Sequence, residues 1–352
     1  MNASHQTVII DDLDTFKSLR AEWEKIYRED PDAMFYSSWN YLDTWFSLEE
    51  TEWFILGVKS YENDSYIGFL PLQKSIKYKS GKRIYGLFKA VTQPLPVYSG
   101  FICLPDKIIE FSNAFSDYLL QDKTWDKLFL SNVFDPKIPR LFSLLSGKKF
   151  MVQQNKAIPA LRLLLPETYD SYLKDNFSRQ SRHQMRSIMR KIENNPEMKI
   201  SSLTEETLER DVGLLIDAWR ERWGKTKLAE LERKMLIQMY RKEQVWIHII
   251  WHLEKPVAML SFFTDREKSI VYSHLTAYDT DYSDLSPGKA LFIYGIRKAI
   301  EEQYKVFDFS QGLDTYKLAF KAEKHEMRSY SIMPRNLKSY LLRLLQVFKS
   351  KK

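Results

Sequence analysis

The sequence has very little cysteine: Cys103 is the single example among 352 residues. One thiol cannot form a disulfide within the chain, nor can it supply the thiolates of structural zinc or iron–sulfur centres. The six histidines are scattered, and His248 and His252, which share one face of an expected strand, have no third ligand nearby in the sequence. We therefore predict no metal cofactor and expect a reducing compartment.

Long apolar runs are also missing. A membrane-spanning helix needs roughly 20 consecutive apolar residues, whereas the apolar run at 158–165 is far shorter and contains Arg162. Residues 1–12 lack the basic region and apolar core of a signal peptide, so we expect a cytoplasmic protein. The sequence contains no P-loop, G-x-S-x-G, H-E-x-x-H or EF-hand pattern, which excludes the sites that these motifs build.

The residues that are present give the composition of a globular protein, with 44% hydrophobic, 28% charged and 14% aromatic residues. A chain of this length is long enough to form two domains. A formal net charge of +7 favours anionic partners. Coenzyme A (CoA), nucleotide-sugars, tRNA and an anionic membrane surface all fit this charge, which does not choose among them.

Strand and helix patterns recur in the same order in the two halves of the chain. The matching segments are 53–56 with 246–249, 67–70 with 257–260, and 127–130 with 305–308. We read this as an old duplication that gives an α/β (α+β) fold of two tandem domains, 1–155 and 156–335. Each domain would hold a mixed, mainly antiparallel sheet flanked by helices. The alternative is that the alternation common to α/β proteins produces the match.

Local patterns place the individual elements. Helices are expected at 14–27, 38–46, 108–120, 169–177, 179–193, 205–223 and 289–302, and strands at 8–10, 53–59, 67–78, 83–90, 98–104, 127–131, 245–252, 257–263, 270–277 and 306–309, with Pro136 and Pro139 marking a loop. Residues 336–352 are expected to form a separate amphipathic, basic helix. It is expected to pack on the second domain, or alternatively to lie on an anionic membrane surface.

The segment 285–300 gives the first indication of chemistry. Ser286 can cap a helix, Pro287 suits its first turn, and Gly288 has no side chain to block the approach of a ligand. Together with Lys289, the N–H groups of such a helix start suit a pyrophosphate. Alone this signal is weak, because many helices start with Ser-Pro.

The stretch 307–320, FDFSQGLDTYKLAF, follows the next expected strand. With the Ser-Pro-Gly helix start and Tyr278-Asp279, it closely resembles the signature of the CelD-like branch (acetyltransferase domain 6) of the GNAT superfamily. The segments 176–186 and 35–39, the latter an F-x-S-x-W pattern, resemble the same branch. The resemblance covers most of residues 30–330. It extends more distantly to Fem-type transferases, which pair two GNAT folds and use aminoacyl-tRNA.

The resemblance implies a donor site for acetyl-CoA or another acyl-CoA at Ser286–Lys289, although the usual GNAT loop has more glycines. Tyr316 stands where GNAT enzymes often place the proton donor for the leaving thiolate. Lys317 would neutralise charge near the phosphates or the acyl group. Asp308 is the best-placed acid, acting as a base or orienting Lys317. The alternatives are a packed aromatic ring for Tyr316 and a buried salt bridge for Asp308.

Acyl transfer to an amine also needs a group that accepts the proton of the amine. His274 lies mid-strand with its side chain on the same face as Tyr272, and an imidazole near its ordinary pKa suits this task. A histidine that is hydrogen-bonded in the core is the alternative.

A basic stripe runs along the expected helix 179–193, because its arginines recur at steps of three, four and four. We expect it to bind an anionic acceptor, such as a nucleotide-sugar or a phosphorylated polymer, unless it is only a solvated face. Two tryptophans on the helix 205–223 would frame the acceptor cleft, or pack in the core. The residues concerned are Arg179, Arg182, Arg186 and Arg190, and Trp219 and Trp223.

These observations predict an N-acyltransferase that moves an acetyl or acyl group from acyl-CoA to a small-molecule or glycan amine. An amino-sugar in surface-polysaccharide synthesis is one such acceptor. The first domain has a glycine-free segment, Leu104–Lys107, where the repeat would place the donor loop, so it is expected to be degenerate. The rivals are a Fem-type transferase that uses charged tRNA, and an inactive module that binds acyl-CoA or a glycan. DNA is not an expected partner, and membrane contact would come only through 336–352.

Overall fold

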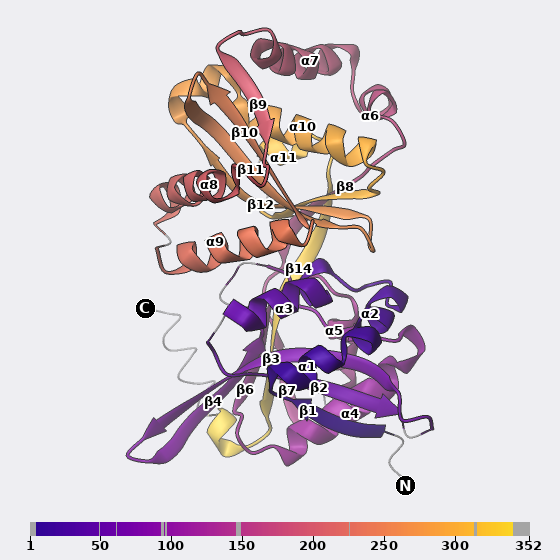
Figure 1. Cartoon of the computed structure of the whole chain (residues 1–352). Coiled ribbons are helices and arrows are strands. Elements are labelled where there is room, and N and C mark those ends of the chain that lie inside the picture. The colour runs from indigo at the N-terminus through magenta and orange to yellow at the C-terminus, as the bar shows by residue number, and fades with distance from the viewer. Residues whose placement is uncertain are drawn as a thin grey trace. The chain divides into compact units, whose positions relative to one another are not determined.

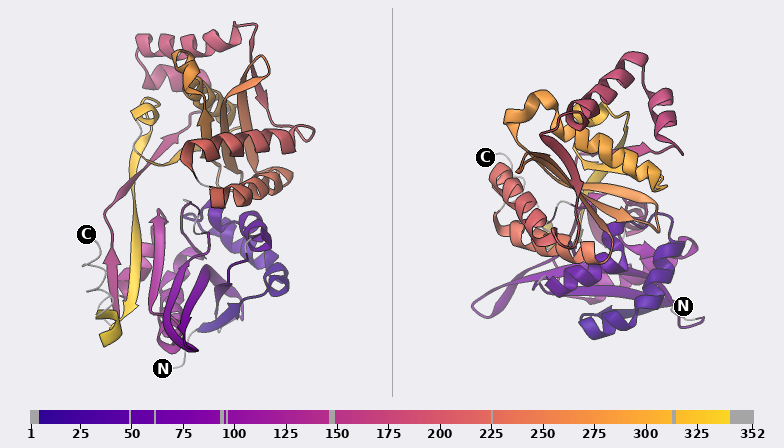
Figure 2. Two further views of the ribbon diagram at one scale, coloured as in Figure 1. Left: turned by 90° about the vertical axis from the view of Figure 1, so that its left-hand side faces the viewer. Right: turned by 45° about the horizontal axis from the view of Figure 1, so that its top comes forward.

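The computed structural model describes residues 5–48, 50–60, 62–92, 95, 97–145, 149–224, 226–312 and 315–340. The chain divides into two compact units, the first formed by residues 1–158 with 326–352 and the second by residues 159–325. Figure 1 labels the elements of both units, and Figure 2 gives two further views. Each unit has a mainly antiparallel sheet flanked by helices, so the predicted fold class is confirmed.

The sheet of the first unit begins with four antiparallel strands, β1 (His5–Ile10), β2 (Trp53–Ser60), β3 (Tyr66–Lys79) and β4 (Lys82–Ala90). Strand β6 (Lys127–Val133) runs parallel to β4, and β14 (Glu323–Pro334) lies between β6 and β7 (Phe150–Gln154), antiparallel to both. The short β5 (Ile102–Cys103) pairs with β3. The helices are α1 (Leu13–Ser18), α2 (Arg20–Glu29), α3 (Trp39–Leu48), α4 (Ile108–Gln121) and α5 (Lys137–Leu145), with 3-10 turns at Phe35–Ser37 and Pro105–Lys107.

The sheet of the second unit repeats this plan. Strands β9 (Met198–Ser202), β10 (Val245–His252), β11 (Lys255–Asp265) and β12 (Ile270–Tyr278) are antiparallel, β13 (Val306–Gln311) is parallel to β12, and β8 (Ile158–Leu164) is antiparallel to β13. The helices are α6 (Tyr169–Asn176), α7 (Arg179–Glu193), α8 (Leu208–Trp223), α9 (Thr226–Arg241), α10 (Pro287–Glu301) and α11 (Thr315–Leu318), with a 3-10 segment, η3, at Thr280–Leu285.

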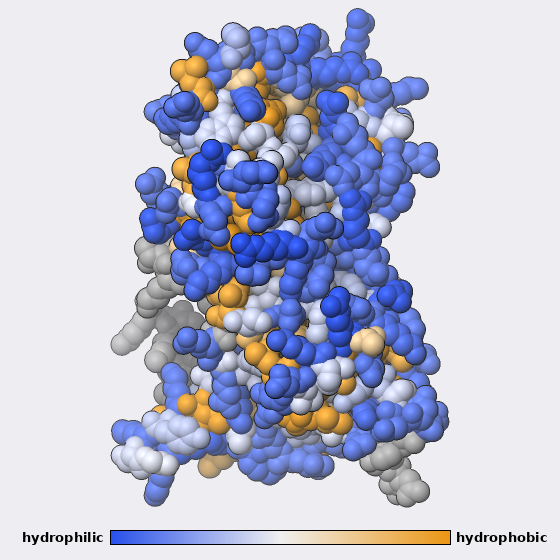
Figure 3. All heavy atoms as spheres, viewed as in Figure 1, coloured by the Kyte–Doolittle hydropathy of each residue, from blue (hydrophilic) through white to orange (hydrophobic). Residues whose placement is uncertain are grey.

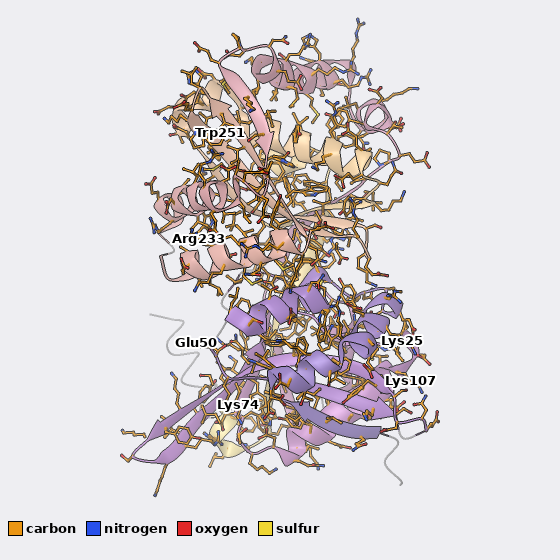
Figure 4. The ribbon with its side chains drawn as sticks, viewed as in Figure 1. Lys25, Glu50, Lys74, Lys107, Arg233 and Trp251 are labelled. Atoms are coloured by element: carbon orange, nitrogen blue, oxygen red, sulfur yellow. The ribbon has the colours of Figure 1, made fainter. Side chains whose placement is uncertain are left out.

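Helices cover the two faces of this second sheet differently. Ala258, Leu260 and Phe262 of β11 belong to the hydrophobic core that contains α10, α6 and α7. Because side chains alternate along a strand, Met259 and Phe263 point to the other face, against which α8 and α9 pack. Arg233 of α9, labelled in Figure 4, reaches Glu209 of α8 at 3.0 Å and ties these two helices together.

The pairing of strand β14 does not match the predicted boundary of the second domain. The sequence analysis placed residues up to 335 in the second domain, whereas Arg328 to Pro334 pair with strands of the first unit. Tyr330 and Ile332 bury their side chains in the core of that unit, which explains where the strand pairs. The following segment begins on the first unit as well, since Lys338 forms an ion pair with Asp126 at 2.7 Å, and not on the second as expected. Most of the helix predicted at 336–352 lies outside the described residues.

The first unit fills the space beyond the end of β4 with its own chain. Ser99 pairs with Val133 at the end of β6, and Ile102–Cys103 pair with β3. The buried Asp135 carboxylate accepts a hydrogen bond from the N–H of Phe101 (3.3 Å), and Asp30 accepts one from the N–H of Cys103 (3.0 Å). The segment 99–103 therefore pairs with both β6 and β3.

On the face that it draws, Figure 3 shows a largely hydrophilic surface with apolar residues in small, scattered groups. Across the described ranges, no helix is both long and apolar enough to cross a bilayer. The same residues contain no cluster of three or more histidine, cysteine, aspartate or glutamate side chains arranged to hold a metal ion.

Candidate functional site

The two parallel strands of the second unit separate partway along their length. β12 and β13 pair from Ile270 with Val306 to Tyr272 with Asp308, and among the described residues no further pair follows. β12 nevertheless continues to Tyr278. The parallel edge of its last residues is therefore open for a ligand, as a parallel ladder would otherwise occupy it.

A bulge in β12 sets which side chains face this opening. Leu260 pairs with Thr276, but Phe262 pairs with Ser273, so β12 holds one extra residue between the two pairs. The hydroxyl of Ser261 accepts a hydrogen bond from the N–H of Leu275 at 2.9 Å, which satisfies a backbone group that the bulge displaces. After the bulge, Thr276 faces α10, whereas His274 remains on the face of α8 and α9.

A cavity of about 240 Å³ lies at the start of α10. It brings together the helix start and the aromatic residue that the sequence analysis assigned to donor binding and acid catalysis. Its walls are formed by Thr276, Tyr278, Ser283, Ser286, Pro287, Gly288, Lys289, Phe292 and Tyr316. The structure thus places four of the five predicted donor-binding residues and one predicted catalytic residue around one space.

The backbone at this helix start is exposed to the cavity. Ser286 occupies the N-cap position, as predicted, but it has left-handed dihedral angles (φ 51°, ψ 50°) and its side chain makes no capping hydrogen bond. Pro287 has no N–H, and the N–H groups of Gly288 and Lys289 have no acceptor among the described residues. A Cβ added to Gly288 would meet only Tyr278, at 3.6 Å, so the helix start remains accessible.

Tyr316 and Lys317 point to different places. The half-buried ring of Tyr316 packs against Phe292, with ring centroids 5.5 Å apart, and lines the cavity. Lys317 is 7% exposed and donates a hydrogen bond to the carbonyl oxygen of Gln311 at 3.0 Å. The ammonium group of Lys317 is therefore engaged with the backbone just after β13, and this residue does not line the cavity.

Asp308 is fully buried in a salt bridge. Its Oδ2 accepts a hydrogen bond from Nε of Arg162 at 2.7 Å, and its Oδ1 accepts one from the N–H of Ser310 at 2.7 Å. Arg162 comes from β8, so the ion pair joins β8 to β13. Of the roles considered for Asp308, this geometry matches the structural one, a buried salt bridge.

His274 forms a second buried pair, on the face of the sheet opposite α10. Its Nε2 lies 2.8 Å from Oε2 of Glu232 on α9, and the two side chains are 6% and 1% exposed. The imidazole also lies 4.5 Å from the ring of Phe263. Glu232 fixes the orientation of the His274 ring. The sequence analysis did not identify Glu232, although the helical periodicity of 226–241 would have placed it on the inner face of a helix.

The predicted basic stripe lines a second, larger cavity of about 700 Å³. Arg179, Arg182 and Arg186 of α7 all border it, together with Arg190. The remaining walls come from Tyr169 of α6, from Ile293 and Arg297 of α10, and from His183, Met185, Met189 and Glu193 of α7. Burial raises the pKa of Tyr169 to about 12, which is the effect expected of an apolar floor.

The two tryptophans of the sequence prediction both belong to α8. Trp219 is 6% exposed and packs in the core under α8, and Trp223 is the last residue of that helix. The neighbouring Arg222, which the sequence analysis did not single out, stacks on the ring of Tyr278 at 4.0 Å and donates to its hydroxyl at 2.9 Å. This pair links α8 to the rim of the smaller cavity.

Comparison with known proteins agrees with this geometry. Residues 179–318 match the sequence model of the acetyltransferase (GNAT) domain, Acetyltransf_6. The fold resembles the crystal structure of FemX, with 11% identity, a TM-score of 0.65, and coverage of 96% of this chain and 99% of that one. It also resembles L-PGS from Bacillus licheniformis (13% identity, TM-score 0.52, coverage 93% and 96%). A tandem GNAT protein from the clavulanic acid biosynthesis pathway is similar as well (8% identity, TM-score 0.53, coverage 94% and 99%). No curated protein sequence matches the chain.

Residues 179–318 thus match the GNAT domain model, and the fold of the chain resembles FemX and a tandem GNAT protein, in agreement with the resemblance that the sequence signature predicted. Most of the second unit matches that acetyltransferase domain model, and the predicted fold of two tandem GNAT-like domains is confirmed. The class of reaction that such a domain supports is acyl transfer.

Proposed function

We propose that the second unit transfers an acyl group from an acyl-CoA to an amine, at the cavity that begins α10. The observation that supports this most strongly is the meeting of a helix N-terminus and a tyrosine in one space. The N–H groups of Gly288 and Lys289 and the positive end of the helix dipole would bind the pyrophosphate. The opening beyond Tyr272 of β12 would take the pantetheine arm and the thioester.

In the reaction, the amine nitrogen attacks the thioester carbonyl, a C–N bond forms, and the C–S bond breaks. Two protons must move: one leaves the amine, and one goes to the leaving thiolate. Tyr316, on the wall of the cavity, would protonate the thiolate and recover its proton from solvent. Exposed N–H groups on the open edge of β12 would stabilise the carbonyl oxygen as it gains negative charge.

His274 is the proposed acceptor of the proton from the amine. It lies on the same strand as Thr276 of the donor cavity, but on the opposite face of the sheet, and Glu232 holds it at 2.8 Å. An amine that approaches from that face would meet the thioester from the side away from α10. Asp308 and Lys317 have structural contacts instead, so we assign them to the support of β13 and the segment after it.

Calorimetric titration with CoA tests the donor site. Gly288→Glu would place a negative side chain at the proposed pyrophosphate site, and we expect the affinity to fall at least tenfold, about 1.4 kcal/mol. Gly288→Ala is the matched control, because its Cβ would meet only Tyr278, at an ordinary contact distance of 3.6 Å. Equal affinities of these two variants, both folded, would contradict the assignment.

The finer predictions concern the acceptor and the location. An amino-sugar acceptor, use in surface-polysaccharide synthesis and a cytoplasmic location stay predictions. Titration with an aminoacyl-tRNA in parallel with CoA separates the acyl-CoA donor from the Fem-type alternative, since only one of the two should compete for the site at α10.

A further inference from the structure

The two cavities described above border the same side of α10. Lys289 lines the smaller cavity, and Ile293 and Arg297 line the larger one. Residues four apart on a helix form one ridge along its surface. At 1.5 Å per residue, this ridge rises about 12 Å from Lys289 to Arg297. The larger cavity therefore starts within a few residues of the proposed pyrophosphate site.

Helix α7 also connects the two cavities. Its arginines form one wall of the larger cavity, and its Lys191 donates a hydrogen bond to the carbonyl oxygen of Asp284 at 3.3 Å. Asp284 belongs to η3, and the adjacent Ser283 lines the smaller cavity. One helix thus packs beside both spaces, on the face of the sheet that carries α10.

The walls of the larger cavity combine positive charge with an apolar floor. Arg179, Arg186 and Arg297 border it from two helices. Nε of Arg297 donates to Glu301 at 2.8 Å, and Nη2 of Arg186 lies 3.8 Å from Asp170, so each guanidinium would use its other N–H groups for a ligand. The floor includes Met189 and Ile293, which are 9% and 3% exposed. Guanidinium groups bind phosphates through charge-assisted hydrogen bonds and also stack on flat rings. Such a site suits a ligand that joins a phosphate to an apolar, planar group.

We propose that this cavity binds the nucleotide end of CoA, with the 3′-phosphate on the arginines and the adenine on the apolar floor. The inference rests on the proposed function of the cavity at the start of α10. In CoA the ribose 3′-phosphate and the adenine follow directly after the pyrophosphate. With the pyrophosphate at Gly288 and the pantetheine arm at the opening of β12, the nucleotide remains to be placed, and the ridge of α10 is available for it.

This occupant replaces the anionic acceptor predicted for the arginine stripe. An acceptor held here would lie on the same side of α10 as the donor and would have to pass the pyrophosphate to reach the thioester. Arg182 is less available for any ligand, because its Nη1 donates to the carbonyl oxygen of Phe177 at 2.8 Å, at the end of α6. The cavity volume of about 700 Å³ is within the roughly 300–1,000 Å³ of typical ligand sites.

The test compares CoA with dephospho-CoA, which lacks only the 3′-phosphate, on the full chain. For the wild-type protein we expect CoA to bind at least tenfold more tightly than dephospho-CoA. Arg186→Gln and Arg297→Gln should each reduce this ratio to about threefold or less and leave the affinity for dephospho-CoA nearly unchanged. Arg241→Gln is the matched control, since Arg241 is exposed at the end of α9, outside the lining of this cavity. Adenosine 3′,5′-bisphosphate should bind alone and be displaced by CoA.

The outcomes separate this inference from the proposed function. Equal binding of CoA and dephospho-CoA, or a ratio that both arginine variants leave intact, overturns the nucleotide site while CoA binding itself upholds the donor cavity. Absence of binding by either compound to the wild-type protein refutes the proposed function. Circular dichroism of each variant checks that the helices are retained.

Discussion

Asp308→Asn separates the structural role of Asp308 from a catalytic one. The substitution keeps the size of the side chain and an oxygen that can accept from the N–H of Ser310, but it replaces the oxygen that faces Arg162 with a donor. The Arg162 guanidinium, whose side chain is 16% exposed, then loses its counter-charge. Breaking such a buried pair costs about 3–5 kcal/mol. For a unit of this size, that loss lowers the unfolding temperature by roughly 6–20 °C.

Thermal unfolding of the full chain, followed by hydrogen exchange in peptides from β8 and β13, measures this loss in the second unit. The double variant Asp308→Leu with Arg162→Met removes the pair without leaving an unpaired charge, so it should lose less stability than Asp308→Asn alone. A shift of less than 2 °C for Asp308→Asn, combined with a fall in acyl transfer of a hundredfold or more, would refute this reasoning and return Asp308 to the catalytic machinery.

Two further predictions concern chemistry and pH. Tyr316→Phe keeps the packing on Phe292 and removes one hydroxyl. The kcat for release of the CoA thiol should therefore fall by roughly 10²-fold or more, while calorimetry shows nearly unchanged CoA affinity. Full turnover of this variant would make the tyrosine a packing residue. Burial lowers the pKa of His248 to about 3, aided by the charge of Lys298. The folded state therefore favours the neutral form of His248. Above pH 6.5 the histidine should not reduce the free energy of unfolding. As the pH drops from there towards 3, this free energy should fall by up to about 1.4 kcal/mol per pH unit. His248→Gln should flatten this dependence in urea titrations, and an unchanged slope would exclude the histidine as its source.

Much of the second unit could be predicted from local patterns. The predicted helices at 179–193 and 289–302 and the strands at 245–252 and 306–309 correspond to α7, α10, β10 and β13. Their hydrophobic periodicity and end signals are contained within each segment, so no distant information is needed. The Ser-Pro-Gly start of α10 likewise indicated a ligand site at the right helix, although Ser286 does not cap it through its side chain.

Elements that depend on strand partners distant in the sequence were not predicted. β14 forms because β6 and β7 lie on either side of it, and both come from well over 150 residues earlier in the chain. Pro139 was taken to mark a loop, yet it stands in the first turn of α5, where a missing N–H costs no hydrogen bond. The predicted helix at 14–27 is two helices, since Leu19 departs from helical geometry.

The candidate site likewise depends on contacts between residues that are distant in the sequence. The signature around Tyr316 could be read from the sequence, but the contacts that decide the roles of its neighbours could not. Arg162 lies 146 residues before Asp308, and Glu232 lies 42 residues before His274. The bulge that turns Thr276 towards α10 is visible only in the register of β12 against β11. Strict alternation would instead have put Thr276 on the face of His274.

The position of β14 imposes an order on the synthesis of this protein. The two strands that flank it, β6 and β7, are complete once residue 154 has been made, but β14 starts at Glu323. At about 5–20 residues per second, the ribosome needs roughly 10–35 s to make the intervening stretch. During that time β6 and β7 present strand edges without their native partner, while every strand of the second sheet is already being made. The first sheet can therefore be completed only when nearly the whole second unit has been made, and until then its unpaired edges are open to pairing with other strands.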